Sequence, residues 1–199
     1  MSRRRDIVAF DRRAPAYEDG WLGQLHHQIA DRTADLALDS VAAPAHILDV
    51  GCGTGYLLRQ LAARAAGAVE LTGIDAAPAM VEAANAAADD PRLHVTTGVA
   101  ERLPFPDATF DLVVSTTSFD HWQDQPAGLA ECARVTAPGG RLVLVDQFSV
   151  LLLPTLLGSR RDKARTRRRA SRLLGAAGYR SWQWHHCYAL IIRAVTATR

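Results

Sequence analysis

The chain has 199 residues, of which 48% are hydrophobic, and its formal net charge is +2. This size and composition favour a single α/β domain with a substantial core, and the near-neutral charge argues against a chain that binds polyanions along its whole length. The cysteines, Cys52, Cys132 and Cys187, are odd in number and lack metal-ligand spacing, which indicates a reducing compartment.

The first 44 residues predict an N-terminal arm followed by a helical cap. Residues 1–20 are polar and predict the arm, whereas the apolar spacing from residue 21 to 41 predicts a helix that ends near Pro44. The basic start has no apolar segment of the signal-peptide kind behind it, and no run of about 18 apolar residues predicts a transmembrane helix. We therefore expect a cytoplasmic protein.

Residues 46–61, H-I-L-D-V-G-C-G-T-G-Y-L-L-R-Q-L, predict a short buried strand, a glycine-rich turn and the start of a helix. Gly51, Gly53 and Gly55 alternate behind Asp49. Glycine permits positive φ and has no Cβ to keep a ligand away from the backbone. The first N–H groups of a helix also lack partners within the helix. The segment therefore predicts a ligand site.

Two classes of cofactor compete for this turn. A dinucleotide fold needs a third glycine at position 56, where this chain has Tyr56. The carboxylate of Asp49 would repel a pyrophosphate, whereas it suits a ligand with a positive amino group. S-adenosylmethionine (SAM) has such a group and no phosphate. The segment resembles motif I of the class I SAM-dependent methyltransferases, in particular methyltransferase domains of type 11.

Later segments add to the resemblance. The apolar run 69–74 ends at Asp75, whose place after the second strand suits ribose hydroxyls, although an aspartate there can also cap a helix. Residues 95–115 resemble the family's third-strand loop and fourth strand, but Val99 stands where the family often has an adenine-binding aspartate. Residues 132–146 resemble the Pro-Gly-Gly turn and fifth strand. The likeness is good over residues 46–148 and looser beyond them.

The alternation of elements predicts a Rossmann-like, doubly wound α/β fold with a mostly parallel sheet, and the resemblance implies seven strands with an antiparallel C-terminal strand. The predicted strands are 46–50, 69–74, 92–97, 110–115 and 141–148, and a closing hairpin over residues 179–196 splits at His185 and His186. The predicted helices after the cap are 55–66, 78–88, 124–137 and 159–177. We expect a single domain with a SAM-binding core at 45–148, then a lid, a basic helix and the hairpin at 149–199, with the ligand beside the carboxyl end of the first strand.

The resemblance implies a set of cofactor-binding residues, namely Tyr17, Asp49, Gly51, Cys52, Gly53, Gly55, Asp75, Ala76, Met80, Ala100, Glu101 and Ser115. Asp49 and the glycines would hold the methionine end of SAM, and Asp75 the ribose. Ala100 and Glu101 would take the adenine side. Tyr17 either closes over the methionine end or anchors the arm, and Cys52 fills space in the turn rather than acting as a reactive thiol.

The segment 115–122, S-T-T-S-F-D-H-W, follows the fourth strand, where the family's acceptor meets the methyl group. Methyl transfer relies on holding the two reactants in line, but an O or N acceptor must also lose a proton. A histidine can take that proton near neutral pH, and His121 is the candidate base. Trp122 and Phe119 either pack on a planar group or belong to the core. His26 and His27, on the cap helix, either line the pocket or serve a structural role.

Two segments near the C-terminus leave alternatives open. Residues 159–172 carry eight positive side chains and one acid, which suits either a solvated helix face or a surface that binds RNA. Residues 148–157 are strongly apolar and predict a lid over a partly apolar acceptor, a dimer patch or a membrane-surface contact. We therefore expect a SAM-dependent methyltransferase with a small-molecule acceptor. An RNA methyltransferase and a non-catalytic SAM-binding protein are the alternatives, and a homodimer stays open.

Overall fold

The computed structural model describes residues 2–148, 166–188 and 191–199. Within these ranges, seven strands form one sheet in the order β3-β2-β1-β4-β5-β7-β6. The strands are β1 (His46–Val50), β2 (Glu70–Asp75), β3 (Leu93–Thr97), β4 (Phe110–Thr116), β5 (Thr136–Gln147), β6 (Ser181–Tyr188) and β7 (Ile192–Thr198). Strands β1 to β5 pair in parallel, and β7 runs antiparallel to both β5 and β6. The predicted fold class is confirmed.

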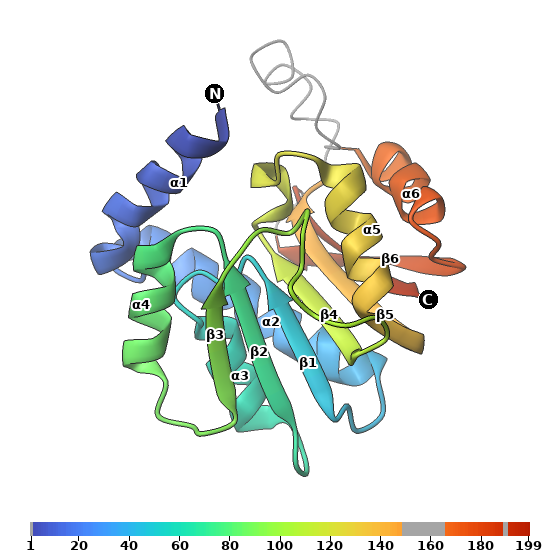
Figure 1. Ribbon diagram of the computed structural model, residues 1–199, viewed down its shortest axis with the longest axis horizontal. Coiled ribbons are helices and arrows are strands. Elements are labelled where there is room, and N and C mark those ends of the chain that lie inside the picture. Colours follow the sequence, from blue (N-terminus) through green and yellow to red (C-terminus); the bar gives the residue numbers. More distant parts are fainter. Residues whose placement is uncertain (1, 149–165, 189–190) are drawn as a thin grey trace.

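Helices cover both faces of the sheet (Figure 1). They are α1 (Ser2–Arg13), α2 (Gly20–Ser40), α3 (Tyr56–Arg64), α4 (Pro78–Ala87), α5 (Gln125–Val135) and α6 (Arg167–Ala176), with 3-10 turns η1 (Ala14–Ala16) and η2 (Phe119–His121). Helices α2 and α3 lie behind the sheet in this view, α5 and α6 lie in front, and α4 flanks the sheet beside its β3 edge, where Ala84 packs near Gly55 at the start of α3. Successive strand residues point to opposite faces, so Ile47 joins the cluster under α2 and α3 while Leu48 joins the one under α5 and α6.

The predicted polar arm is wrong in its secondary structure, because residues 2–13 form α1. Ile7, Phe10 and Ala14 recur at helical spacing and pack against Ala77 and Met80 at the start of α4. The Asp11 carboxylate accepts a hydrogen bond from the Ala79 N–H at 3.0 Å, which fixes α1 to the same helix end. Arginines surround the apolar residues of this segment, so its overall composition is polar. The composition therefore suggested an arm, although the spacing of the apolar residues is that of a helix.

The C-terminal hairpin forms, but its predicted split at His185 and His186 is wrong. Both histidines lie inside β6, where His185 pairs with Ala194 and His186 with Arg193. His185 Nε2 lies 3.0 Å from Thr196 Oγ1, so its ring has a polar partner on the neighbouring strand. Polar side chains such as these can therefore lie within this outer strand. Strand β6 continues through both histidines to Tyr188.

Other boundaries differ modestly from the predicted ones. Strand β5 begins at Thr136, before the Pro-Gly-Gly turn, because Thr136 already pairs with Phe110 ahead of a bulge. The described part of the predicted helix 159–177 is α6, and residues 159–165 lie outside the described residues. Most of the predicted lid, residues 149–157, also lies outside them. Among the described residues, no helix is both long and apolar enough for a membrane crossing.

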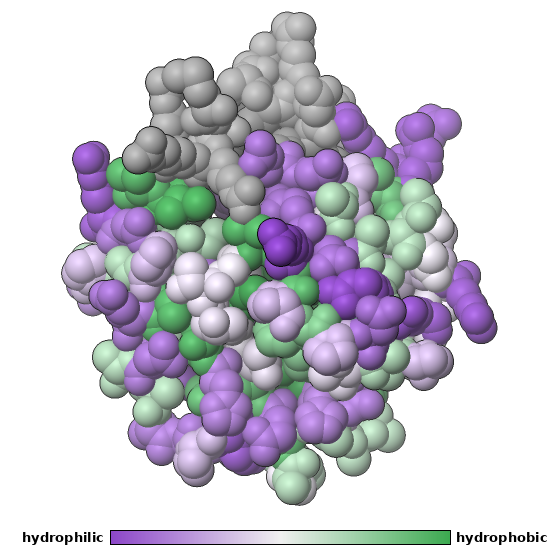
Figure 2. All heavy atoms as spheres, in the orientation of Figure 1, coloured by the Kyte–Doolittle hydropathy of each residue, from purple (hydrophilic) through white to green (hydrophobic). Residues whose placement is uncertain are grey.

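On the face of the molecule where α5 and α6 lie in front of the sheet, hydrophilic side chains are interspersed with hydrophobic ones (Figure 2). Strongly hydrophobic atoms gather beside α1, at the upper left of this view. That region borders the edge of the sheet where β1, β2 and β4 have their carboxyl ends, and α1 stands above it (Figure 1). In open α/β sheets a ligand crevice forms outside the carboxyl ends of the strands, so this edge is where a site is expected.

Candidate active site

The turn after β1 brings the backbone close to other parts of the chain. Gly51 and Gly53 have φ values of 78° and 54°, in the left-handed region that favours glycine. A Cβ at Gly51 would lie 2.1 Å from Ser118 Oγ, so no side chain fits at this position. The Gly51 N–H also donates to the Ile74 carbonyl at 2.7 Å, which ties the turn to the end of β2.

Asp75, at the end of β2, holds this turn. The Gly53 N–H donates to Asp75 Oδ2 and the Ala77 N–H donates to Oδ1, both at 2.9 Å. Burial raises the pKa of Asp75, whereas these backbone hydrogen bonds lower it. The carboxylate therefore faces the glycine turn, as predicted, and it precedes α4, whose N-cap is Ala77.

Asp49 is a buried acid, and the charge that acts on it within the described part of the chain is that of another acid, Asp75. The Asp49 side chain is 2% exposed, and its Oδ1 atom has no hydrogen-bond partner among the described residues. Burial raises the pKa of Asp49 to about 8, and the neighbouring charge of Asp75 adds to the shift. A buried polar atom without a partner is costly in a native protein, so this atom marks a position that a ligand group would satisfy.

A first cavity opens above the carboxyl ends of β1, β2 and β4, with about 800 Å³ of empty space, part of it open to solvent. It is lined by Ile7, Phe10, Tyr17, Val50, Gly51, Gly53, Ile74, Asp75, Ala76, Ala77, Met80, Gly98, Val99, Ala100, Glu101, Thr116, Thr117, Ser118, His121, Trp122 and Gln123. The lining is mostly apolar, and Asp75 and Glu101 supply its acidic groups.

A second cavity continues from the first around the glycine turn, and its lining is far more ionisable. It is lined by Tyr17, Glu18, His26, His27, Ala30, Asp49, Gly51, Cys52, Gly53, Thr54, Tyr56, Leu57, Thr116 and Thr117. Three buried atoms on its wall, His26 Nδ1, Asp49 Oδ1 and Thr116 Oγ1, have no hydrogen-bond partner among the described residues. The second cavity thus offers several unsatisfied polar groups to the polar end of a ligand.

Tyr17 lies at the junction of the two cavities and belongs to an aromatic group. Its ring stacks on His26 with centroids 5.1 Å apart, and Phe10 meets His121 edge-to-face at 5.0 Å. Burial raises the pKa of Tyr17 and lowers that of His26, so both groups stay neutral near pH 7. These rings connect α1 and α2 with η2 over the cavities.

Glu18 joins the N-terminal segment to the glycine turn, and sequence reasoning missed it because no motif surrounds it. Its Oε1 atom accepts hydrogen bonds from Thr54 Oγ1 at 2.6 Å and from Arg59 at 2.9 Å. Its Oε2 atom lies 3.2 Å from His27 Nε2. Although burial raises the pKa of Glu18, the hydrogen bonds from Thr54 and Arg59 lower it overall, so the group is ionised at neutral pH.

The segment after β4 provides the wall opposite the glycine turn. Thr117 has a φ of 52°, which is strained for a β-branched residue and is a feature that collects at functional sites. Ser118 Oγ donates to the Val50 carbonyl at 2.9 Å and accepts from Trp122 Nε1 at 3.1 Å. These bonds hold His121 and Trp122 against the first cavity.

Ten of the predicted cofactor-binding residues line one or both cavities, namely Tyr17, Asp49, Gly51, Cys52, Gly53, Asp75, Ala76, Met80, Ala100 and Glu101. His121, the candidate base, and both histidines of the cap helix do so as well. Burial raises the pKa of Cys52 well above its usual value, which agrees with a space-filling role rather than a reactive thiol.

Two predicted residues stand apart from the cavity linings. Gly55 is the N-cap of α3, and a Cβ there would lie 3.2 Å from Ala84, so it shapes the turn and its packing on α4. Ser115 is fully buried, and its hydroxyl donates to the Val50 carbonyl at 2.8 Å. Ser115 thus lies behind Val50 and Ser118, which line the first cavity, whereas Thr116 lines both cavities. The structure therefore does not bring Ser115 to the ligand surface.

The linings of the two cavities match the polarity of SAM. The first suits a nucleoside, because apolar walls flank an acid at the end of β2. The second suits an amino-acid group, because an unsatisfied buried carboxylate lies next to backbone N–H groups and neutral histidine. A phosphate-bearing cofactor fits poorly beside these two carboxyl groups, since ionisation of either one would bring like charges together in a partly desolvated site.

Comparisons with known proteins agree with this geometry. A model of a methyltransferase domain family matches residues 48–144. Demethylmenaquinone methyltransferase of Thermus thermophilus is 44% identical over 117 residues, which are 58% of this chain and 52% of the relative. The 27-O-demethylrifamycin SV methyltransferase of Amycolatopsis mediterranei is 33% identical over 172 residues, or 84% of this chain and 61% of the relative. The chain spans about half the length of the curated relatives it matches.

Solved structures show the same fold. A chain in the complex between the Haloferax volcanii Trm112 methyltransferase activator and a putative methyltransferase has a TM-score of 0.82, with 22% identity and coverage of 95% of this chain and 96% of that one. Human N-acetylserotonin methyltransferase in complex with SAM has a TM-score of 0.72, with 20% identity and coverage of 98% and 57%.

Proposed function

We propose that the chain is a class I SAM-dependent methyltransferase that transfers a methyl group from SAM to a small organic acceptor, as its similarity to the methyltransferase domain family and to the relatives above supports. The observation that carries the proposal is the unsatisfied Asp49 carboxyl beside the glycine turn, in a cavity that shares lining residues with the mostly apolar first cavity. A buried acid in this state is explained by a cationic amino group that binds there.

The cofactor, SAM, supplies an activated methyl group on a sulfonium, and the chain would position it through named groups. In this proposal Asp49 binds the amino group, and the backbone of Gly51 and Gly53 lies against the methionine chain. Asp75 keeps its bonds to Gly53 and Ala77 and accepts from the ribose hydroxyls with its remaining lone pairs. Tyr17 closes the junction of the two cavities.

The adenine side of the proposed cofactor site is built from apolar and backbone groups. Ala76 and Met80 would pack on one side, and Ala100 and Glu101 would lie on the other. Glu101 Oε1 already accepts hydrogen bonds from the N–H groups of Gln123 and Asp124, at 2.6 and 3.1 Å. Its second oxygen would be the group that receives the adenine amino hydrogen in place of the aspartate that Val99 replaces.

The reaction asks the chain to hold two reactants in line and to take a proton from an O or N acceptor. We assign the removal of this proton to His121, which belongs to η2 and lines the first cavity beside Phe10. Thr116 and Thr117 line both cavities, so the acceptor would approach the methyl group past them. The proposed roles of His121, Thr116 and Thr117 rest on where these residues lie, and substitution of each residue tests its role.

The acceptor we propose is a partly apolar small molecule. Ile7, Phe10 and Trp122 line the outer part of the first cavity, where an apolar body would lie. The relatives named above are methyltransferases of demethylmenaquinone and a demethylrifamycin, which are organic molecules with large apolar parts. No relative named above supports the RNA alternative.

Incubation of the purified protein with methyl-labelled SAM and fractionated cell extract tests the function. We expect the label in an organic-soluble small molecule, with no change after RNase treatment. Label that is lost after RNase treatment would instead establish the RNA methyltransferase. Tight SAM binding without transfer to any fraction would establish a non-catalytic SAM-binding protein.

A further inference from the structure

The connection between β3 and β4, residues 98–109, crosses the sheet without a helix. Its first residues form part of the wall of the first cavity. Within the described residues, the strand-like pairing of this connection is limited to one isolated bridge between Val99 and Arg102. Backbone N–H and C=O groups in such a long irregular segment need partners from elsewhere. The partners determine where the cavity wall lies.

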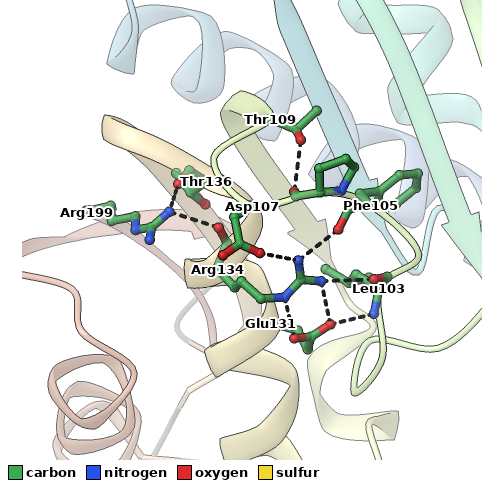
Figure 3. A network of polar contacts seen from close by, with 9 residues as sticks. Leu103, Phe105, Asp107, Thr109, Glu131, Arg134, Thr136 and Arg199 are labelled. Atoms are coloured by element: carbon green, nitrogen blue, oxygen red, sulfur yellow. Dashed lines mark hydrogen bonds and ion pairs between the residues drawn. The ribbon is translucent and has the colours of Figure 1, made fainter.

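Glu131 and Arg134, one turn apart on α5, supply those partners (Figure 3). Glu131 Oε2 accepts from the Leu103 N–H at 2.8 Å, and an Arg134 terminal nitrogen donates to the Leu103 carbonyl at 2.9 Å. Both backbone polar groups of Leu103 are therefore bound by one ion pair. Arg134 also donates to the Phe105 carbonyl and to Asp107, each at 2.8 Å.

Every nitrogen of the Arg134 guanidinium takes part. Its Nε donates to Glu131 Oε1 at 2.7 Å, and its terminal nitrogens reach Glu131, Leu103, Phe105 and Asp107. The side chains of Arg134 and Glu131 are 30% and 22% exposed, so solvent replaces these bonds poorly. A guanidinium presents five donors in a planar fork, which neither lysine nor glutamine reproduces.

Leu103 lies only two residues after the part of the connection that lines the cavity, so its position affects the position of the cavity wall. Leu103 is 3% exposed in the core under α5, and the preceding Arg102 N–H donates to the Val99 carbonyl at 3.1 Å. Glu101 is held separately by the start of α5. The wall formed by residues 98–101 is thus fixed to α5 at both ends of that helix.

We propose that Arg134 and Glu131 are a positioning pair that sets the nucleoside wall of the cavity and thereby the affinity for the adenosine part of the cofactor. This inference rests on the proposed function, because the wall acquires its ligand there. The pair touches neither cofactor nor acceptor in this account. Its effect is therefore expected on ligands that carry adenosine, whichever group they carry at the sulfur.

The test compares Arg134→Gln with Arg92→Gln, a closely matched control. Arg92 pairs with Asp90 at 2.6 Å, donates to the Ala62 carbonyl at 2.9 Å and is 31% exposed, but it lies at the opposite end of β3 from the cavity wall. Calorimetric titration would use SAM and methylthioadenosine, which keeps the adenosine and lacks the aminoacyl chain. We expect both ligands to bind about tenfold more weakly to Arg134→Gln and unchanged to Arg92→Gln.

Hydrogen exchange of the unliganded variants supplies a readout that does not depend on the cofactor. Amides of residues 98–109 should exchange faster in Arg134→Gln than in the wild type or Arg92→Gln. Equal affinities and equal exchange in the two variants would overturn the inference. If the wild type bound neither SAM nor methylthioadenosine, the proposed function would fail. The proposed role of Arg134 and Glu131 in cofactor affinity would then fail as well. Should Arg134→Gln not fold, Glu131→Gln tests the same pair, since its amide has one acceptor oxygen and cannot replace both carboxylate oxygens that bind Arg134.

Discussion

At the scale of single residues, Asp49 is the side chain whose protonation depends most on the cofactor. Burial and the charge of Asp75 raise its pKa to about 8, so the empty site holds it mostly protonated at neutral pH. A cationic amino group next to the carboxyl favours the ionised form and lowers that pKa. Binding of SAM should therefore expel a proton.

The first prediction is a proton release of about one per SAM bound near pH 7, which disappears above about pH 9 where Asp49 is already ionised. Calorimetric titration in buffers with different ionisation enthalpies measures it. Asp49→Asn should bind SAM more weakly and release no proton. An equal proton release from the wild type and Asp49→Asn would show that Asp49 does not bind the amino group.

The second prediction concerns His121, which should act on the acceptor and not on the cofactor. His121→Asn should lower kcat about a hundredfold with the acceptor found in extract, because proton transfer loses its base, while the Kd for SAM changes little. His185→Asn is the control, since His185 lies on β6 and bonds to Thr196 away from both cavities. A kcat for His121→Asn that equals the control would remove His121 from the chemistry.

The residues that the sequence predicted best are those whose roles come from backbone geometry and strand order. Asp49 lies near the end of β1, Gly51 and Gly53 follow that strand, and Asp75 ends the next one. Glu18 could not be found, because its bonds to Thr54 and Arg59 join segments far apart in the chain. Ser115 does not line either cavity, because its hydroxyl bonds to the Val50 carbonyl behind the lining, a contact that the strand pattern does not reveal.

At the scale of elements, α1 is the part of the site that sequence composition did not predict, because its residues are mostly polar. It covers the first cavity through Ile7 and Phe10, and its hold on α4 passes through the Asp11 carboxylate at the Ala79 N–H. A carboxylate at a helix N-terminus contributes about 1 kcal/mol. This bond is therefore a suitable place to weaken α1 without disturbing the sheet.

The third prediction is that Asp11→Ala releases SAM about fivefold faster, because loss of the bond loosens the cover over the cavity. Asp35→Ala is the control, since Asp35 pairs with Arg64 between α2 and α3 and leaves α1 untouched. Stopped-flow displacement of bound SAM measures both dissociation rates. If the two variants release SAM equally fast, α1 does not control exit from the site.

Other element boundaries show what a sequence pattern leaves open. The strands β1 to β4 were predicted closely because buried apolar runs are bounded there by glycine, proline or acids. The hairpin split was wrong because polar residues on an outer strand look like a turn, yet His185 finds a partner in Thr196. The helix-free connection at 98–109 is stable through Arg134, a long-range contact that no local pattern predicts.

At the scale of the whole molecule, the sheet order places β1 and β4 side by side at the point where the chain reverses direction across the sheet. The glycine turn after β1 and the Thr117 segment after β4 therefore face each other across the same crevice. Both the fold and the position of the site follow from that order. The acceptor does not, because it depends on side chains of α1, α2 and η2 that approach from outside the sheet.

The measurement that tests the central claim most directly is calorimetric titration of the purified protein with SAM and, in parallel, with NADH. We predict that SAM binds at a single site per chain, that Asp75→Ala abolishes this binding because the glycine turn loses its bond to Gly53, and that NADH gives no binding heat. Tight binding of NADH together with no response to SAM would contradict the account.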